Sequence, residues 1–233
     1  MSIAANEKGQ ALMLRVNGPH VKDSAKWKWR KLQPTNMHML DLCALWSEPG
    51  RTPLLAGCQG SLFEWHYPFT TPLHSRATGA FHPKAIWSAN SKDIWVLAHG
   101  RPPPALYHFD GKKLKPMTKG LPERCEYRAI AGSAANDVWL VGEDGCIAHF
   151  DGTEWSEVPS GFDERLSGVW AAEPAHAWAV GVGGTILEWN GQAWRRQESD
   201  TLQDLLAISG SSERDVWVVG EAGTVLHQTL SAP

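Results

Sequence analysis

The amino-acid sequence predicts an all-β protein assembled from repeated small antiparallel sheets, and three observations support this. The 233 residues include 22 Gly and 15 Pro, which is typical of short strands joined by many turns. One pattern of strands and turns returns five times along the chain. The chain also contains 13 Trp, whose large apolar side chains can fill the space between small sheets.

The five repeats align on one position in their second predicted strand. That position holds Leu54, Trp95, Trp139, Trp178 and Trp217, at spacings of 41, 44, 39 and 39 residues. The repeats themselves occupy residues 44–65, 85–114, 129–158, 167–197 and 207–228. Four short strands in roughly 40 residues, repeated in this way, are the arrangement of a β-propeller with one blade per repeat.

Each predicted strand has its own signal. The first carries an apolar residue preceded by Ala or Gly, and only a small residue fits where several first strands crowd near an axis. The second strand alternates and ends at a glycine in four repeats. The third ends in Asp-Gly or Asn-Gly at 110–111, 151–152 and 190–191, which predicts a two-residue type I′ hairpin to a fourth strand.

The two ends of the chain predict how the repeats close into a ring. The last repeat stops after its third strand, at residues 224–230, and has no fourth. The segment WKWRKL at 27–32 resembles the fourth strand AWRRQE at 193–198. We therefore expect a single five-bladed β-propeller domain of four-stranded antiparallel blades over residues 11–230, closed by this N-terminal strand, with 1–10 as a mobile tail.

The composition limits the kinds of partner that the protein can bind and indicates its cellular compartment. A formal net charge of −3 excludes binding to nucleic acid driven by bulk electrostatics and offers no cationic face to a membrane. The N-terminus has no leader pattern, and no apolar run is long enough to span a bilayer. The four cysteines show no C-x-x-C pair, so we expect reduced thiols and a cytoplasmic location.

Catalytic groups are weakly indicated. Glu48 and Glu173 follow the first strands of two different repeats and are the best candidates for a paired-carboxylate site. No acid occupies the equivalent place in the other repeats, so solvated turn residues are the better interpretation. We expect no enzyme activity and no cofactor.

Metal ligands are also weakly indicated. One repeat position holds His108, His149, His227, Glu64 and Glu188, but these lie on separate blades, too far apart to share an ion. The acids that precede the second strand, Asp93, Asp137 and Asp215, are interpreted as turn residues. No metal site is expected.

The candidate binding residues are aromatic. Trp46, Trp87 and Trp170 share a repeat position that holds Ala131 and Ser209 elsewhere, which suggests a one-sided aromatic surface near the axis. Its polar neighbours would be Glu48, Glu173 and Asn90. Packing between blades is the alternative interpretation of these tryptophans.

Two functions follow from this pattern. The first is a protein–protein interaction scaffold or adaptor that uses the loops on a propeller face. The second is a lectin that binds a glycan at the aromatic residues near the axis. The loops between first and second strands differ between repeats, and 67–84 is unique to one of them, so a single asymmetric protein partner is favoured.

Residues 136–155, NDVWLVGEDGCIAHFDGTEW, and 214–228, RDVWVVGEAGTVLHQ, carry a family resemblance. They resemble the bacterial β-propeller repeats written DVWAVGxxGTILHWDGxxW, which are abundant in myxobacterial proteins. The resemblance covers about residues 40–228 and extends distantly to the propellers of photosystem assembly factors and tachylectin-type lectins. It implies a fold, and a role only loosely, because propellers include enzymes, lectins and scaffolds.

Overall fold

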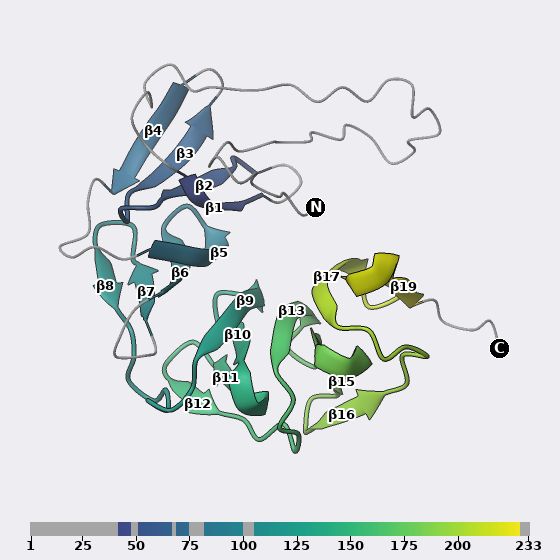
Figure 1. The fold of residues 1–233 in the computed structure, drawn as a ribbon. Helices are drawn as coiled ribbons and strands as arrows, with labels where there is room; N and C mark the ends of the chain where they lie inside the picture. The colour runs from purple at the N-terminus through teal and green to yellow at the C-terminus, as the bar shows by residue number, and fades with distance from the viewer. Residues whose placement is uncertain (1–41, 48–50, 67–68, 75–81, 100–104, 229–233) are drawn as a thin grey trace, which may run out of the picture. The chain divides into compact units, whose positions relative to one another are not determined.

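The computed structural model describes residues 42–47, 51–66, 69–74, 82–99 and 105–228 (Figure 1). The chain divides into two compact units, residues 1–82 and 83–233, and each is described by itself. The predicted closing strand at 27–32 and the predicted tail at 1–10 lie outside the described residues.

The first unit contains one antiparallel sheet in chain order. Its strands are β1 (Leu42–Trp46), β2 (Leu54–Gly57), β3 (Leu62–His66) and β4 (Phe69–His74). Leu55, Phe63 and Trp65 form its buried core. Alternation along each strand places these side chains on one face of the sheet.

The second unit contains four antiparallel sheets. Three have four strands, namely β5 (His82–Asn90) to β8 (Leu114–Pro116), β9 (Tyr127–Ala134) to β12 (Trp155–Glu157), and β13 (Leu166–Glu173) to β16 (Trp194–Gln197). Their inner strands are β6 (Asp93–His99), β7 (Leu106–Phe109), β10 (Asp137–Gly142), β11 (Ile147–Phe150), β14 (His176–Gly181) and β15 (Ile186–Trp189). The last sheet has three, β17 (Leu205–Ser212), β18 (Asp215–Gly220) and β19 (Val225–Gln228).

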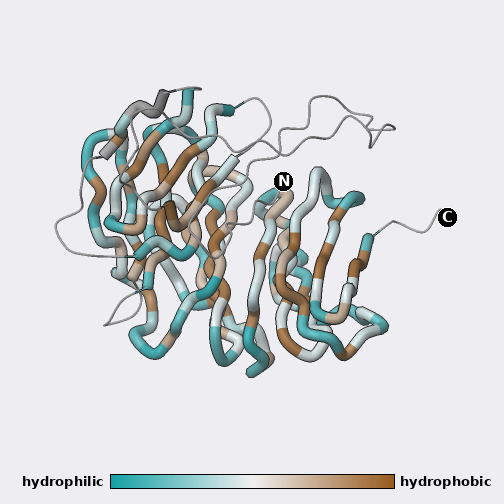
Figure 2. The backbone as a smooth tube through the Cα atoms, turned by 45° about the horizontal axis from the view of Figure 1, so that its top comes forward, coloured by the Kyte–Doolittle hydropathy of each residue, from teal (hydrophilic) through white to brown (hydrophobic). Residues whose placement is uncertain are grey.

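These elements confirm the prediction of an all-β fold built from antiparallel sheets. The described residues contain no α-helix, only the short 3₁₀ turns η2 (Glu143–Gly145), η3 (Val182–Gly184) and η4 (Glu221–Gly223). Apolar residues lie along the strands of the second unit and hydrophilic ones at its turns (Figure 2). Sequence alternation and turn glycines therefore predict the local structure well.

Tryptophans pack the sheets of the second unit against one another. Trp95 is fully buried and meets Trp155 of the next sheet edge to face, with ring centroids 5.2 Å apart. Trp139 is equally buried and meets Trp194 of the following sheet at the same distance. Such edge-to-face pairs add about 0.5–1.5 kcal/mol to the burial of apolar area.

The first strands of neighbouring sheets lie side by side, as β9, β13 and β17 do in Figure 1. A Cβ atom added to Gly168 on β13 would lie 3.4 Å from the Cα of Ala207 on β17. The small residue expected before each first-strand apolar position is therefore set by the close approach of adjacent strands.

The prediction of reduced thiols is wrong for all four cysteines. Cys43 pairs with Cys58, and Cys125 pairs with Cys146. In the first pair the bond links adjacent strand ends, and in the second it links the segment before β9 to the turn after β10. Each pair joins the first and second strands of one sheet, so the strand register brings the cysteines together, and the absence of a C-x-x-C pair does not exclude them. A cytoplasmic location loses this support and stays a prediction.

The predicted type I′ hairpins are also wrong. Phe109 pairs directly with Leu114, so four residues separate the third and fourth strands of that sheet. Only the glycine, Gly111, has a positive φ there. The Asp110 carboxylate accepts the backbone N–H groups of Lys112 and Lys113, and the same contacts recur at Asp151 and Asn190. The acid or amide stabilises a wider turn through its side chain.

Candidate functional site

A buried carboxylate organises the sheet β9–β12. The Asp137 side chain has no exposure and accepts hydrogen bonds from His149 Nε2 at 2.7 Å, Trp139 Nε1 at 3.0 Å and Ser133 Oγ at 2.5 Å. The His149 ring stacks on Trp139 with centroids 4.1 Å apart. Trp139 Nε1 and His149 Nε2 thus bond to the same acid, and such hydrogen bonds are what the burial of a charge requires.

The same arrangement recurs in two other sheets. Asp215 accepts hydrogen bonds from Ser211, Trp217 and His227. In the sheet β5–β8, Asp93 bonds to His108, which stacks on Trp95. We predicted that these acids serve the turns, and this is wrong: they join the second and third strands of their own sheets. Each histidine bonds to the acid of its own sheet, and this shared structural role explains why a histidine recurs at that position in three repeats.

The pKa of Asp137 follows from this environment. Burial by itself would raise the pKa, but the hydrogen bonds from His149, Ser133 and Trp139 favour the charged form and outweigh it. The pKa of the carboxyl group therefore lies below its usual value. The pKa of Asp215 is lowered by its hydrogen bonds from Ser211, His227 and Trp217.

The fourth repeat departs from this network. His176 stands where three other sheets have the acid, and Glu188 stands where those three have the histidine. The exchanged residues do not pair, because Glu188 accepts a hydrogen bond from Gln197 and His176 turns to other carboxylates. The buried Trp178 Nε1 has no hydrogen-bond partner, and neither has Trp95 Nε1 in the second repeat.

His176 instead forms a cluster with two glutamates. Its Nδ1 lies 2.8 Å from Glu173 Oε1 and 3.6 Å from Glu213 Oε2. Glu173 and His176 flank the turn between β13 and β14, and Glu213 lies in the turn between β17 and β18. All three side chains are at least one-third exposed. Their ligand atoms lie within 4.8 Å of one another.

Sequence reasoning selected Glu173 but missed His176 and Glu213. The signal for His176 was present, since it replaces an aspartate that three other repeats share. Glu213 carries no such signal, because the turn between first and second strands varies in every repeat. Only the packing of β13 beside β17 brings it to the other two.

Two of the predicted aromatic binding residues lie between sheets. Trp87 is buried against Gly132 of the next sheet, where an added Cβ would lie 2.8 Å from the indole. Trp170 covers Gly210 of its next sheet in the same way, at 2.7 Å. This is the packing alternative considered above, and the carbohydrate interpretation draws no support from these contacts. A binding role for either residue stays a prediction.

The structure does not bring the remaining predicted binding residues together in one site. Trp46, in the first unit, is half-buried with the Arg51 guanidinium 5.6 Å from its ring centroid. Asn90 Oδ1 accepts the backbone N–H of Lys92 and so stabilises the turn before β6. Glu48 lies outside the described residues.

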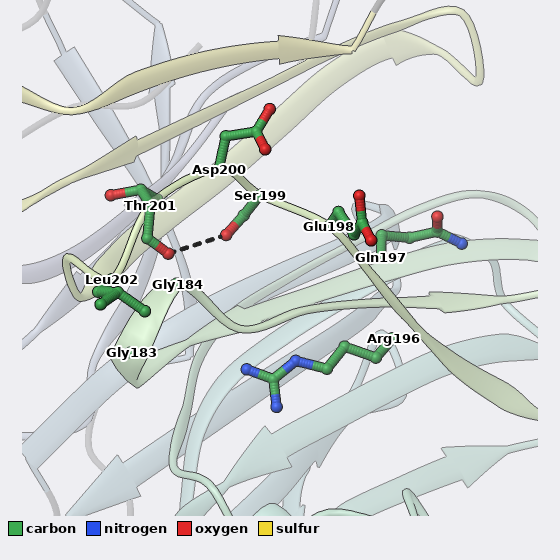
Figure 3. A pocket seen from close by; sticks show the side chains of 9 residues that line it. All are labelled: Gly183, Gly184, Arg196, Gln197, Glu198, Ser199, Asp200, Thr201 and Leu202. Atoms are coloured by element: carbon green, nitrogen blue, oxygen red, sulfur yellow. Dashed lines mark hydrogen bonds between the residues drawn. The ribbon is translucent and has the colours of Figure 1, made fainter.

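An open pocket of about 560 Å³ lies at the end of β14 opposite to His176 (Figure 3). It is lined by residues 183–184 and 196–202. Arg196 is bonded to Glu164 and to Thr185, and Ser199 Oγ donates to the carbonyl of Thr201. Arg196 and Ser199 are therefore already engaged within the fold.

The repeated antiparallel sheets and their packing place the fold of this protein in the β-propeller class. No protein-family model matches the chain, and no curated protein matches it. No helix in the described part of the chain is long and apolar enough to cross a membrane.

Solved structures share the fold at low identity. YCF48 from Cyanidioschyzon merolae is similar with a TM-score of 0.67 and 14% identity, over 95% of this chain and 80% of that one. A structure described as YCF48 bound to D1 peptide has a TM-score of 0.56 and 16% identity, over 83% of this chain and 63% of that one. The WD40 β-propeller domain of Doa1 has a TM-score of 0.61 and 12% identity, over 82% of this chain and 64% of that one. In the last two cases this chain spans less than two thirds of the other.

Replacing Asp137 with Asn is expected to lower the free energy of unfolding at pH 7 by about 2 kcal/mol, because hydrogen bonds to a charged group are lost. The folded-state pKa of Asp137 lies below its unfolded value near 4. Its contribution is therefore complete above that value and is lost as the pH falls through the folded pKa. Urea unfolding measured between pH 7 and pH 3 should show that the free energy of unfolding falls less steeply with falling pH in the variant than in the native chain. The exposed Glu198→Gln is the control, and an identical pH slope for Asp137→Asn and the native chain would contradict the network.

Replacing Gly210 with Ala is expected to cost about 2 kcal/mol, because the new methyl group would collide with the Trp170 ring. The three atoms nearest to the added Cβ all belong to the Trp170 ring. In a Trp170→Ala background the same change should therefore cost less than about 0.5 kcal/mol. Urea unfolding of the four proteins in this double-mutant cycle measures the difference. An equal cost in both backgrounds would show that Trp170 does not pack on Gly210.

Proposed function

We propose that this chain is a non-enzymatic binding module that docks onto a protein partner. The repeated side chains are used for the fold, in the acid–histidine–tryptophan networks and the packing between sheets. The turns between first and second strands, at 90–93, 134–137, 173–176 and 212–215, vary in sequence and lie at one end of the sheets of the second unit. We call this end the turn face.

The observation that carries the proposal is the charge gathered on the turn face. Glu173, His176, Glu213 and Arg214 are non-repeated residues from two neighbouring sheets, and all have considerable exposure. Exposed charges at the rim of an interface steer a partner and fix its orientation. A one-sided charged surface suits one asymmetric partner better than several equivalent ligands, and peptide binding by a similar structure, YCF48, is compatible with this role.

Capture of the partner tests the proposal. The tagged chain is incubated with lysate of the organism that makes it, and retained proteins are quantified by mass spectrometry. The double variant Glu213→Lys, Arg214→Glu should reduce retention of the partner about tenfold, because it exchanges the positions of a negative and a positive charge on the turn face. The control Glu198→Lys changes an exposed charge at the opposite end and should retain the partner fully.

Equal retention by the turn-face variant would contradict the proposed docking face. A glycan array probed in parallel gives the other decisive result. Glycan binding that is lost in Trp170→Ala, with no protein retained, would make this chain a lectin.

We also propose that the protein is a closed five-bladed ring in which residues 27–32 supply the missing fourth strand beside β19. The support is an unfilled face on the last sheet. Trp217 is 47% exposed, whereas its equivalents Trp95 and Trp139 have no exposure. Val219 and Val225 on the same sheet are also exposed. Exposed apolar groups gathered on one small sheet indicate a surface that another element covers.

Replacing Trp217 with Ala tests closure. In a closed ring the side chain is buried, and the variant should lose about 3 kcal/mol of unfolding free energy, as large-to-small core changes do. In an open arrangement the loss should stay below about 1 kcal/mol. Urea unfolding measures it, with Trp139→Ala as a buried reference and Leu202→Ala, at a residue 87% exposed, as an exposed one. A loss matching Leu202→Ala would exclude closure over this face.

A further inference from the structure

The cluster of Glu173, His176 and Glu213 has the composition of a cation site. One imidazole nitrogen and two carboxylate oxygens, contributed by two sheets, lie within 4.8 Å of one another. It is the one such group of three among the described residues. Ligands around a tetrahedral ion with bonds of about 2.0–2.1 Å stand about 3.3 Å apart. Small side-chain rotations from the observed 2.8 Å and 3.6 Å separations would reach this spacing.

The repeat supplies an independent argument about His176. In three sheets the histidine is on the third strand and is held by an acid and a tryptophan of that sheet. In the fourth, the histidine and the acid have changed places, and the imidazole stands at the turn instead. Glu188 and His176 do not pair with each other, so the exchange does not rebuild the acid–histidine contact of the three other sheets. It places an imidazole on the turn face beside carboxylates from two turns.

The frame around the cluster is fixed. Trp189 Nε1 donates a hydrogen bond of 3.2 Å to the carbonyl of Pro174, which holds the turn between Glu173 and His176. The Trp178 ring stacks beside the His176 ring with centroids 6.5 Å apart. Glu213 is carried by the turn between two paired strands. A ligand set on short turns between strands needs little ordering when an ion binds.

We propose that Glu173, His176 and Glu213 bind one divalent transition-metal ion of the Zn²⁺ type. An imidazole nitrogen favours such ions over Ca²⁺ and Mg²⁺, which prefer oxygen ligands alone. On binding, the ion takes the place of the proton that His176 Nδ1 shares with Glu173, and that proton is released or moves to Nε2. Three protein ligands leave the fourth tetrahedral position open to water or to another ligand. The site does not depend on the proposed partner.

Isothermal titration calorimetry of the untagged chain with Zn²⁺ tests the site. We expect one Zn²⁺ per chain, and no binding of Ca²⁺ at the same concentrations. Glu213→Gln and His176→Ala should each weaken Zn²⁺ binding at least about tenfold, since even the loss of an outer partner of a ligand costs about 10–100-fold. The matched control is His66→Ala, which removes the histidine of an exposed His–Glu pair with no third ligand among the described residues.

Nitrogen-15 NMR of the histidine rings supplies a second readout. A Zn²⁺-dependent shift of His176 Nδ1 is expected, and circular dichroism verifies that each variant is folded. The proposal is overturned by the absence of saturable binding, by unchanged affinity in Glu213→Gln or His176→Ala, or by loss of binding in His66→Ala.

Discussion

The packing of large indole rings between neighbouring sheets is the interaction on which the second unit depends. A sheet of four strands, each three to nine residues long, cannot bury both faces by itself, so large indoles fill the space toward the next sheet. Each indole and imidazole brings polar atoms inside with it. Asp137 collects these donors in one place, and the histidine stacks on the tryptophan to fix its ring. In the sheet β9–β12, the packing of Trp139 and the pairing of its indole nitrogen are therefore one arrangement.

The repeat pattern predicted much of the fold because it reports on backbone requirements that every sheet shares. Strand order, the glycine turns and the crowded small residue at Gly168 all follow from local periodicity. The cysteine pairs and the wider turns at Asp110 could not be found in this way. The cysteine pairs depend on the exact register of the first and second strands, and the wider turns depend on side-chain hydrogen bonds that compete with the backbone turn.

The candidate site was harder to predict, and for a related reason. A repeated residue is easy to detect and usually serves the fold, as the tryptophans, acids and histidines do. A functional residue is expected to differ between repeats, and difference alone does not distinguish a ligand from a neutral turn residue. Glu173 was selected for its position, but Glu213 becomes relevant only when two neighbouring sheets are seen together.

The fit of Trp87 on Gly132 and of Trp170 on Gly210 has a consequence for assembly. Between these two junctions, the equivalent positions hold the small residues Ala131 and Ala171, which belong to one packed cluster. Five near-copies of one motif in a single chain could associate in the wrong order during folding, since their backbones are nearly equivalent. A large side chain that fits only against glycine makes each junction selective. The contact surfaces of the sheets thus favour the correct order of neighbours. A sheet in the wrong place would either place a tryptophan against a side chain larger than glycine or leave a void between the two sheets.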